Sequence, residues 1–325
     1  VSEAGNRFEH VMAITLDKRF DYKVGVIRSI ISRTGDMLVS GSLDRSALYK
    51  ISGEDLEHFE IGEKLIIKNQ DELIEKIGGD DMDFIGLEDP DIWIDEENNL
   101  LHLYFTIAFK YKNKKGYNVS LGHAFGTDLD SLVMTEPVLM DDGYNSAKEV
   151  SIAPLNSRGF RYNLIESSDY LNGEHYSTVR LAILKDMGGN WEFGKVAFHP
   201  AEHNIKWLGG HASPGPLFPK SFIDIGKNKL VGILNGRESD TFIDGEKVAR
   251  GVFAVGLYIY DFEEGKIDWV SPDSLIVDTE AKIITFASQF VETKNGEGIL
   301  YAHVDDSFVR AYTLDAEKIK NILPL

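Results

Sequence analysis

The sequence predicts an all-β protein, and more specifically a five-bladed β-propeller. Short runs of apolar or alternating residues recur along the whole chain, and turn-forming Gly, Asn or Asp residues bound each run. Only residues 70–77 and 315–322 look helical. The runs also group into repeats of about 45–70 residues, which is typical of the radial blades of a propeller.

The repeats share one form, which defines the predicted blades. An apolar strand is followed by a hairpin, an outer strand and a short acidic tail, and residues 46–67 and 119–139 share a Gly-x-Asp-Leu turn. Clear strands are expected at residues 100–107, 118–124, 229–235 and 251–261. The blades are predicted at residues 22–68, 82–140, 145–199, 205–277 and 281–321, with a closing strand from residues 1–21. No linker interrupts the series, so one domain over residues 1–325 is expected; the alternative is a pair of β-sandwiches.

The composition restricts the partners and the chemistry. With 34 basic and 53 acidic residues the net charge is −19, which repels phosphate backbones and anionic lipid, so neither nucleic acid nor a membrane is an expected partner. Apolar runs such as residues 252–260 are too short to span a bilayer. The absence of cysteine excludes disulfides and thiolate catalysis. The first residues do not resemble a signal peptide, so the expected location is the cytoplasm, or outside it if a signal peptide was removed before residue 1.

Several segments in order resemble a known family. Residues 86–92 have the sequence Gly-Leu-Glu-Asp-Pro-Asp-Ile, which resembles the Gly-x-Glu-Asp-Pro-Arg-Ile segment of glycoside hydrolase family 130, the mannoside phosphorylases and mannosidases. Residues 300–309 and residues 250–261, followed by Ser271-Pro272, are similar to later segments of that family. The resemblance extends over most of the chain from about residue 45, and it implies a five-bladed propeller that acts on an oligosaccharide.

The resemblance implies roles for the acidic residues of the second blade. Asp89 corresponds to the general acid, which protonates the oxygen of the glycosidic bond. Glu88 and Asp91 would position the sugar or raise the pKa of the acid. Pro90 fixes the start of an inner strand, whose side chains can reach the central funnel. The alternative is that Glu88 and Asp89 only cap a turn.

Two further blades supply other candidates. Lys148 fits a basic position of family 130, whereas Glu149 resembles the catalytic Glu of the related family 43 and is the rival acid. Asp306 interrupts an apolar run at residues 299–314, where a charge is costly without partners. The resemblance assigns Asp306 to binding of substrate hydroxyls, and the alternative is an acidic residue of a hairpin turn.

The fourth blade opens with a loop rich in Gly and Pro that resembles the family's Lys-x-Gly-x-Gly-Pro-Pro segment. In this loop Lys206 and His211 offer donors for hydroxyls or phosphate, and Trp207 is expected to stack on a sugar unless it is packed in the core. Asn235 is included among the substrate-binding residues, although family phosphorylases have a His there that contacts phosphate. Glu166 likewise stands where the family has an Arg.

These departures favour hydrolysis over phosphorolysis, because a phosphate site needs converging cations. The base that activates water is then Glu149, Glu166 or Asp306. The expected function is a glycosidase acting on a β-mannoside or similar oligosaccharide, with inorganic phosphate as a second possible partner. The alternatives are a phosphate-dependent mannoside phosphorylase, a propeller that binds glycans without catalysis, and a protein-binding propeller. The nine histidines show no metal-ligand spacing and no phosphate-binding loop occurs, so neither a metal nor a cofactor is expected.

Overall fold

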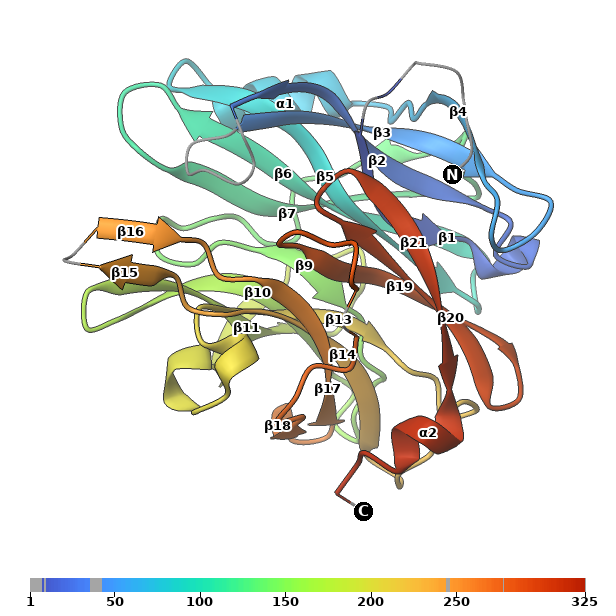
Figure 1. Ribbon diagram of the computed structural model, residues 1–325. Coiled ribbons are helices and arrows are strands. Elements are labelled where there is room, and N and C mark those ends of the chain that lie inside the picture. The colour runs from blue at the N-terminus through green and yellow to red at the C-terminus, as the bar shows by residue number, and fades with distance from the viewer. Residues whose placement is uncertain (1–7, 9, 36–42, 244–245, 277, 325) are drawn as a thin grey trace. The chain divides into compact units, whose positions relative to one another are not determined.

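The computed structural model describes residues 8, 10–35, 43–243, 246–276 and 278–324, and the described chain is all-β with two short α-helices (Figure 1). The chain divides into two compact units. The first comprises Val1–Glu149, Asp186–Trp191 and Ser307–Val309, and the second comprises Val150–Lys185, Glu192–Asp306 and Arg310–Leu325. Each unit is described by itself. No helix among the described residues is long and apolar enough to cross a membrane.

The first unit contains two groups of antiparallel strands. One group is β1 (His10–Leu16), β2 (Val24–Thr34), β3 (Leu43–Ser52) and β4 (Glu60–Lys64). The other is β5 (Met82–Asp95), β6 (Leu100–Tyr111), β7 (Tyr117–Gly126) and β8 (Val133–Met134). Between them runs α1 (Gln70–Gly78), which confirms the helix predicted at residues 70–77.

A single parallel bridge joins the two groups, where Ser46 of β3 pairs with Gly86 of β5. A Cβ atom at position 86 would lie 2.3 Å from the carbonyl oxygen of Ser46, so only glycine allows this approach. The core of the unit is built on β6, whose successive residues are almost all buried, and it includes Ile74 of α1. The glycine that opens the Gly-Leu-Glu-Asp-Pro segment therefore joins the strand groups and sets the position of the acidic residues that follow it.

The second unit contains three groups of strands. The first is β9 (Lys148–Ser151), which enters the unit at residue 150, with β10 (Arg161–Leu171), β11 (Glu174–Leu184) and β12 (Glu192–Phe198). The second is β13 (His211–Leu217), β14 (Lys229–Arg237), β17 (Phe253–Asp261) and β18 (Lys266–Val270). A single parallel bridge between Ser177 and His211 joins these two groups. The third is β19 (Thr285–Lys294), β20 (Glu297–Val304) and β21 (Phe308–Asp315).

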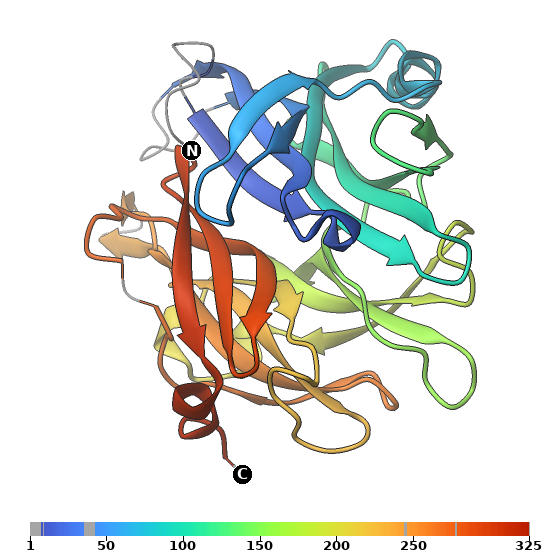
Figure 2. The ribbon, with the colours of Figure 1, turned by 90° about the vertical axis from the view of Figure 1, so that its right-hand side faces the viewer.

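Smaller elements complete the second unit. β15 (Thr241–Ile243) and β16 (Glu246–Ala249) form a separate hairpin between β14 and β17. Figure 2 shows β19, β20 and β21 as neighbouring orange-red to red strands, followed by α2 (Ala316–Lys320). The helix is shorter than the predicted 315–322. Asp315 is its N-cap and accepts a hydrogen bond from the Lys318 N–H, and Asn321 is its C-cap. Two buried apolar clusters fill the unit, one around β14, β17 and β20 and the other around β10, β11 and β13.

Candidate functional site

The long strand β5 is interrupted at the acidic segment. Glu88 lies opposite Thr106 and Asp91 lies opposite Tyr104, so the register shifts by a bulge between them. Asp89, within the bulge, has a φ of 46°, in the left-handed region that residues other than glycine rarely adopt, least of all before proline. Pro90 has no N–H to leave unpaired in the bulge. Strain of this kind is concentrated at functional sites, so the segment is a candidate for one.

Arg28 of β2 connects the acidic segment to its neighbours. Its Nη1 donates to Asp89 Oδ1 at 2.8 Å, and its Nη2 donates to Glu88 Oε1 at 2.7 Å. Its Nε donates to the Ser46 hydroxyl at 2.9 Å, and this hydroxyl donates to Glu88 at 3.1 Å. The side chains of Arg28, Glu88 and Asp89 are only 9%, 15% and 5% exposed. One buried guanidinium therefore orients two carboxylates.

The first residues of β9 complete this cluster within the first unit. The side chain of Glu149 is hydrogen-bonded to Asp89, and the positive charge of Lys148 acts on both Glu88 and Asp89. Glu149 also has a left-handed backbone, with a φ of 50°. Three carboxyl groups thus face two cations, and a hydrogen bond between two carboxyl groups requires a proton on one of them. The cluster is electrically balanced when it holds one proton.

The buried acids differ in how their surroundings affect ionisation. Burial opposes ionisation of Asp89, but the charges of Arg28 and Lys148, together with hydrogen bonds from Arg28 and Glu149, outweigh it and lower the pKa of Asp89. For Glu88 burial outweighs Arg28, so the pKa of Glu88 is raised. Burial alone raises the pKa of Asp91 to about 7. The site therefore combines an ionised carboxylate with carboxyl groups that hold protons more readily.

In the second unit His211 begins β13 and lies beside a buried acid. Its Nε2 is 3.2 Å from Oε2 of Glu166 on β10, and the two side chains are 12% and 3% exposed. The ring of His211 also packs edge-on against Phe253, with 5.0 Å between ring centroids. Glu166, which was considered as one of three possible bases, is therefore paired with an imidazole. Lys206 is 93% exposed and lies 3.6 Å from Glu238.

Two predicted substrate-binding residues have structural positions instead. Trp207 is 7% exposed and lies in the core, where its Nε1 donates to the Ser271 carbonyl at 3.1 Å. Gly256 leaves room for the indole, since a Cβ atom there would lie 2.3 Å from it. The structure has the alternative that the sequence left open, a Trp207 ring packed in the core and not exposed to a sugar. The sequence could not distinguish the two roles of Trp207, because a loop rich in Gly and Pro is expected with either one.

Asn235 of β14, which was included among the substrate-binding residues, also has a structural position. Its side chain is fully buried and bridges to β19, accepting from the Ala287 N–H at 2.7 Å and donating to the Ala287 carbonyl at 2.9 Å. Both ends of the amide are used by the backbone of one residue, so the side chain is not available to a ligand.

Asp306 lies in the turn between β20 and β21, not within a strand as the apolar run at residues 299–314 suggested. It has a φ of 46°, and its Oδ1 is 3.0 Å from Nδ1 of His303. The neighbouring Asp305 accepts three backbone hydrogen bonds, from Lys282, Ile283 and Ile284. A role of Asp306 toward substrate stays a prediction.

Sequence reasoning missed Arg28 and Ser46. Arg28 lies in the middle of a strand whose other residues from 25 to 30 are buried, and a charge in an apolar run is costly unless it has partners. That signal was present in the sequence. The partners of Arg28 could not be found in this way, because Glu88 and Asp89 are 60 and 61 positions away.

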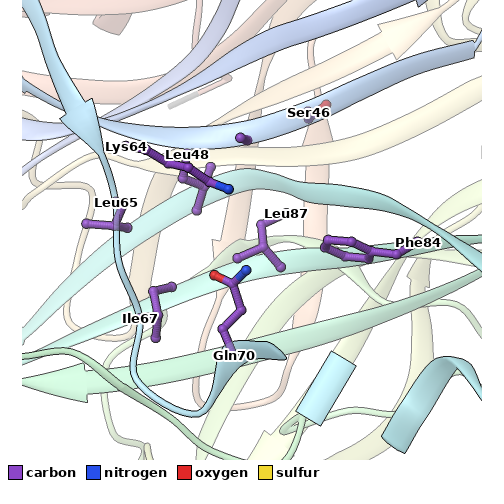
Figure 3. A pocket seen from close by; sticks show the side chains of 9 residues that line it. Ser46, Leu48, Lys64, Leu65, Ile67, Gln70, Phe84 and Leu87 are labelled. Carbon is purple, nitrogen blue, oxygen red and sulfur yellow. The ribbon is translucent and has the colours of Figure 1, made fainter. Parts of the chain in front are cut away.

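A small cavity lies beside this cluster (Figure 3). Its volume is about 30 Å³, and its walls include Ser46, Leu48, Gln70, Phe84 and Leu87. A space of this size holds about one water molecule, so it is not a sugar pocket. No group of three or more His, Asp or Glu residues that could hold a metal ion occurs in the part of the chain that the structure describes.

Comparison with known proteins gives a clear result for the fold. No family model matches the sequence, and no curated protein matches it significantly. Among solved structures, β-1,2-mannobiose phosphorylase from Listeria innocua is similar with a TM-score of 0.67 and 12% identity, over 99% of this chain and 95% of that one. The mannose phosphorylase MPT-4 from Leishmania mexicana is similar with a TM-score of 0.56 and 16% identity, over 97% and 87%.

A third similar structure is the arabinanase Arb43A from Bacillus subtilis, with a TM-score of 0.53 and 12% identity, over 95% of each chain. The chain therefore has the all-β fold of these carbohydrate-active enzymes, and the resemblance to the mannoside phosphorylases is confirmed at the level of the fold. At these identities the likeness concerns the fold alone.

Proposed function

We propose that this chain is a carbohydrate-active enzyme that cleaves the glycosidic bond of a β-mannoside or similar oligosaccharide. The observation that carries the proposal is the hydrogen-bonded pair of Asp89 and Glu149, which holds one proton beside Arg28. Both acids have left-handed backbones, and such strain is retained where it serves a function. The fold shared with two phosphorylases of mannose-containing sugars and with an arabinanase supports an enzyme that acts on carbohydrate.

The carboxyl pair matches what glycosidic cleavage requires. As the bond between the anomeric carbon and the leaving oxygen breaks, its electron pair stays on the oxygen, which takes the proton of the pair. In hydrolysis a water oxygen forms the new bond to the anomeric carbon, and the proton lost by that water passes to a carboxylate of the site. Asp91 has a pKa of about 7, so it can hold a proton or a charge near neutral pH.

Hydrolysis is the preferred form of the reaction. Asn235 replaces the phosphate-contacting His of the family, and its amide is used by the backbone of β19. Glu166 stands in place of an arginine and adds negative charge where phosphate would need cations. Phosphorolysis is the second candidate, because two of the similar structures are phosphorylases.

The proposal includes the architecture that forms the site. Residues 1–325 make a single five-bladed propeller, with blades formed by the strand groups β1–β4, β5–β8, β9–β12, β13 with β14, β17 and β18, and β19–β21. The hydrogen bond from the Val11 N–H to the Ser307 carbonyl supports the role of the N-terminal strand in closing the ring.

Product analysis tests the function directly. The purified protein is incubated with β-1,2-mannobiose and with 4-nitrophenyl β-mannoside, with and without inorganic phosphate. Release of free mannose without phosphate is expected, and both Asp89→Asn and Glu149→Gln should lower the rate at least about 100-fold. Asp83→Asn, which changes an exposed acid of β5, is the matched control and should leave the rate unchanged.

Other outcomes discriminate between the alternatives. Formation of mannose 1-phosphate only in the presence of phosphate would establish phosphorolysis instead. Saturable binding of mannobiose without any product would support the non-catalytic glycan-binding alternative. Neither turnover nor binding across a panel of β-mannosides would contradict the assignment to this substrate class.

A further inference from the structure

We propose that Arg28 is a positioning residue that keeps Asp89 ionised and leaves the shared proton on Glu149. The inference rests on the proposed function for its catalytic meaning, because it makes Glu149 the proton donor of the pair. Its test does not depend on that function, because the location of the proton can be measured in the free protein.

The geometry around Arg28 favours charge on its partners. Two N–H groups of one planar guanidinium donate to Asp89 at 2.8 Å and to Glu88 at 2.7 Å, and the third direction is used by Ser46. Hydrogen bonds from a cation are strongest to an ionised acceptor, and this preference increases in a buried site. A lysine offers a point charge and cannot present this fork, so the arrangement specifically requires arginine.

The direction of the hydrogen bond between the acids follows from this. Asp89 accepts from Arg28, and its contact with Glu149 also favours the charged form of Asp89, so Glu149 is the donor. The other ionisable groups around Asp89 are Glu88 and Asp91 on the same strand and Lys148 on β9. Lys148 acts in the same sense as Arg28.

The backbone supplies a second reason for the contact. A left-handed residue before proline is held only where its surroundings outweigh the strain. The ion pair to Arg28 anchors the Asp89 side chain in that conformation, with the carboxylate directed at the guanidinium. Without Arg28, a buried carboxylate would face Glu88 with less compensation, and Asp89 would bind a proton more readily.

The test follows the ionisation of Asp89 by NMR. Protein with ¹³C-labelled Asp carboxyl groups is titrated, and the Asp89 resonance is identified by its absence in Asp89→Asn. We expect Asp89 to titrate below its usual range in the wild type and at least one pH unit higher in Arg28→Met. Arg28→Lys should give an intermediate shift, and it serves as the second variant if Arg28→Met does not fold. An Asp89 midpoint that is the same in the wild type and in both variants would overturn the proposal.

Arg33→Met is the matched control. Arg33 is on the same strand and forms a two-bond ion pair with Asp44, at 2.7 and 2.6 Å, with similarly low exposure. Removal of the Arg33 guanidinium should leave the titration midpoint of Asp89 unchanged. A shift as large as that in Arg28→Met would mean that loss of any buried arginine of β2 changes the titration of Asp89, and it would also overturn the proposal. If 4-nitrophenyl β-mannoside is turned over, Arg28→Met should displace the pH–rate profile and Arg33→Met should not. Absence of turnover would count against the proposed function, while the titration still decides the role of Arg28.

Discussion

The residues that define this site are charged side chains with little access to water. A carboxyl group in such a position is either paired with a cation or holds a proton. Asp89 is paired with a cation, Arg28. Asp91 holds a proton more readily, because burial raises its pKa to about 7. Two acids two positions apart on one strand thus differ in their ionisation at neutral pH.

Asp91 makes the stability of the protein depend on pH. Its pKa is 3.8 when unperturbed and about 7 in the folded protein, so folding favours the protonated form. Below about pH 4 Asp91 is protonated in both the folded and the unfolded state, so it does not affect stability. As the pH rises to about 7, Asp91 ionises in the unfolded state but keeps its proton in the folded state, and the free energy of unfolding falls. The total loss is a few kcal/mol, at about 1.4 kcal/mol per pKa unit. Asp91→Asn should therefore be more stable than the wild type by a few kcal/mol at pH 8.5 and by only about 1 kcal/mol at pH 4.5.

Urea unfolding at the two pH values measures this effect. Asp83→Asn is the control, because Asp83 is on the same strand and is 53% exposed. A stability difference between Asp91→Asn and the wild type that does not grow with pH would show that Asp91 is ionised in the folded protein.

At the scale of elements, single polar side chains join strands that no ladder connects. Asn235 links β14 to β19 through both hydrogen-bonding groups of Ala287. Replacement by Ala should lower the free energy of unfolding by about 2–4 kcal/mol, because two buried backbone groups lose their partners. Asn295→Ala, in the exposed turn after β19, should change it by less than about 0.5 kcal/mol. Chemical denaturation followed by circular dichroism gives both values, and equal effects would contradict the bridging role.

The turn between β20 and β21 offers a paired comparison. The Asp305 carboxylate accepts hydrogen bonds of 2.9–3.0 Å from three successive backbone N–H groups before β19, whereas Asp306 lies beside His303. Asp305→Ala should cost about 2–4 kcal/mol of stability, and Asp306→Ala should cost less than half of that. Thermal unfolding of the two variants makes the comparison. A larger loss of stability for Asp306→Ala than for Asp305→Ala would contradict the structural role given to Asp305.

At the scale of the whole molecule, the net charge of −19 is the dominant electrostatic feature. Repulsion among like charges opposes the compact state and is screened by salt. The melting temperature should therefore rise by several degrees between about 10 mM and 150 mM NaCl. KCl at equal ionic strength should have the same effect. A melting temperature that falls with salt would mean that surface ion pairs outweigh the general repulsion.

Much of the fold could be predicted from local patterns. The strands expected at residues 100–107, 118–124, 229–235 and 251–261 are β6, β7, β14 and β17, with ends that either coincide with the prediction or differ from it by up to four residues. The differences arise because strand ends depend on which neighbours continue the hydrogen-bond ladder. The acidic segment at residues 88–91 was also singled out from the sequence, and so was Glu149, as the rival acid. The hydrogen bond between Asp89 and Glu149 was not predicted and comes only from the structure.

The sequence by itself determined the alternation that makes these strands, the excess of negative charge and the acidic segment before Pro90, because each of these is a property of neighbouring residues. Only the tertiary structure decided that Arg28 pairs with Asp89, that Asn235 binds a backbone and that Trp207 lies in a core. These outcomes depend on contacts between distant parts of the chain. A buried charge or ring takes its role from the partners that packing brings to it.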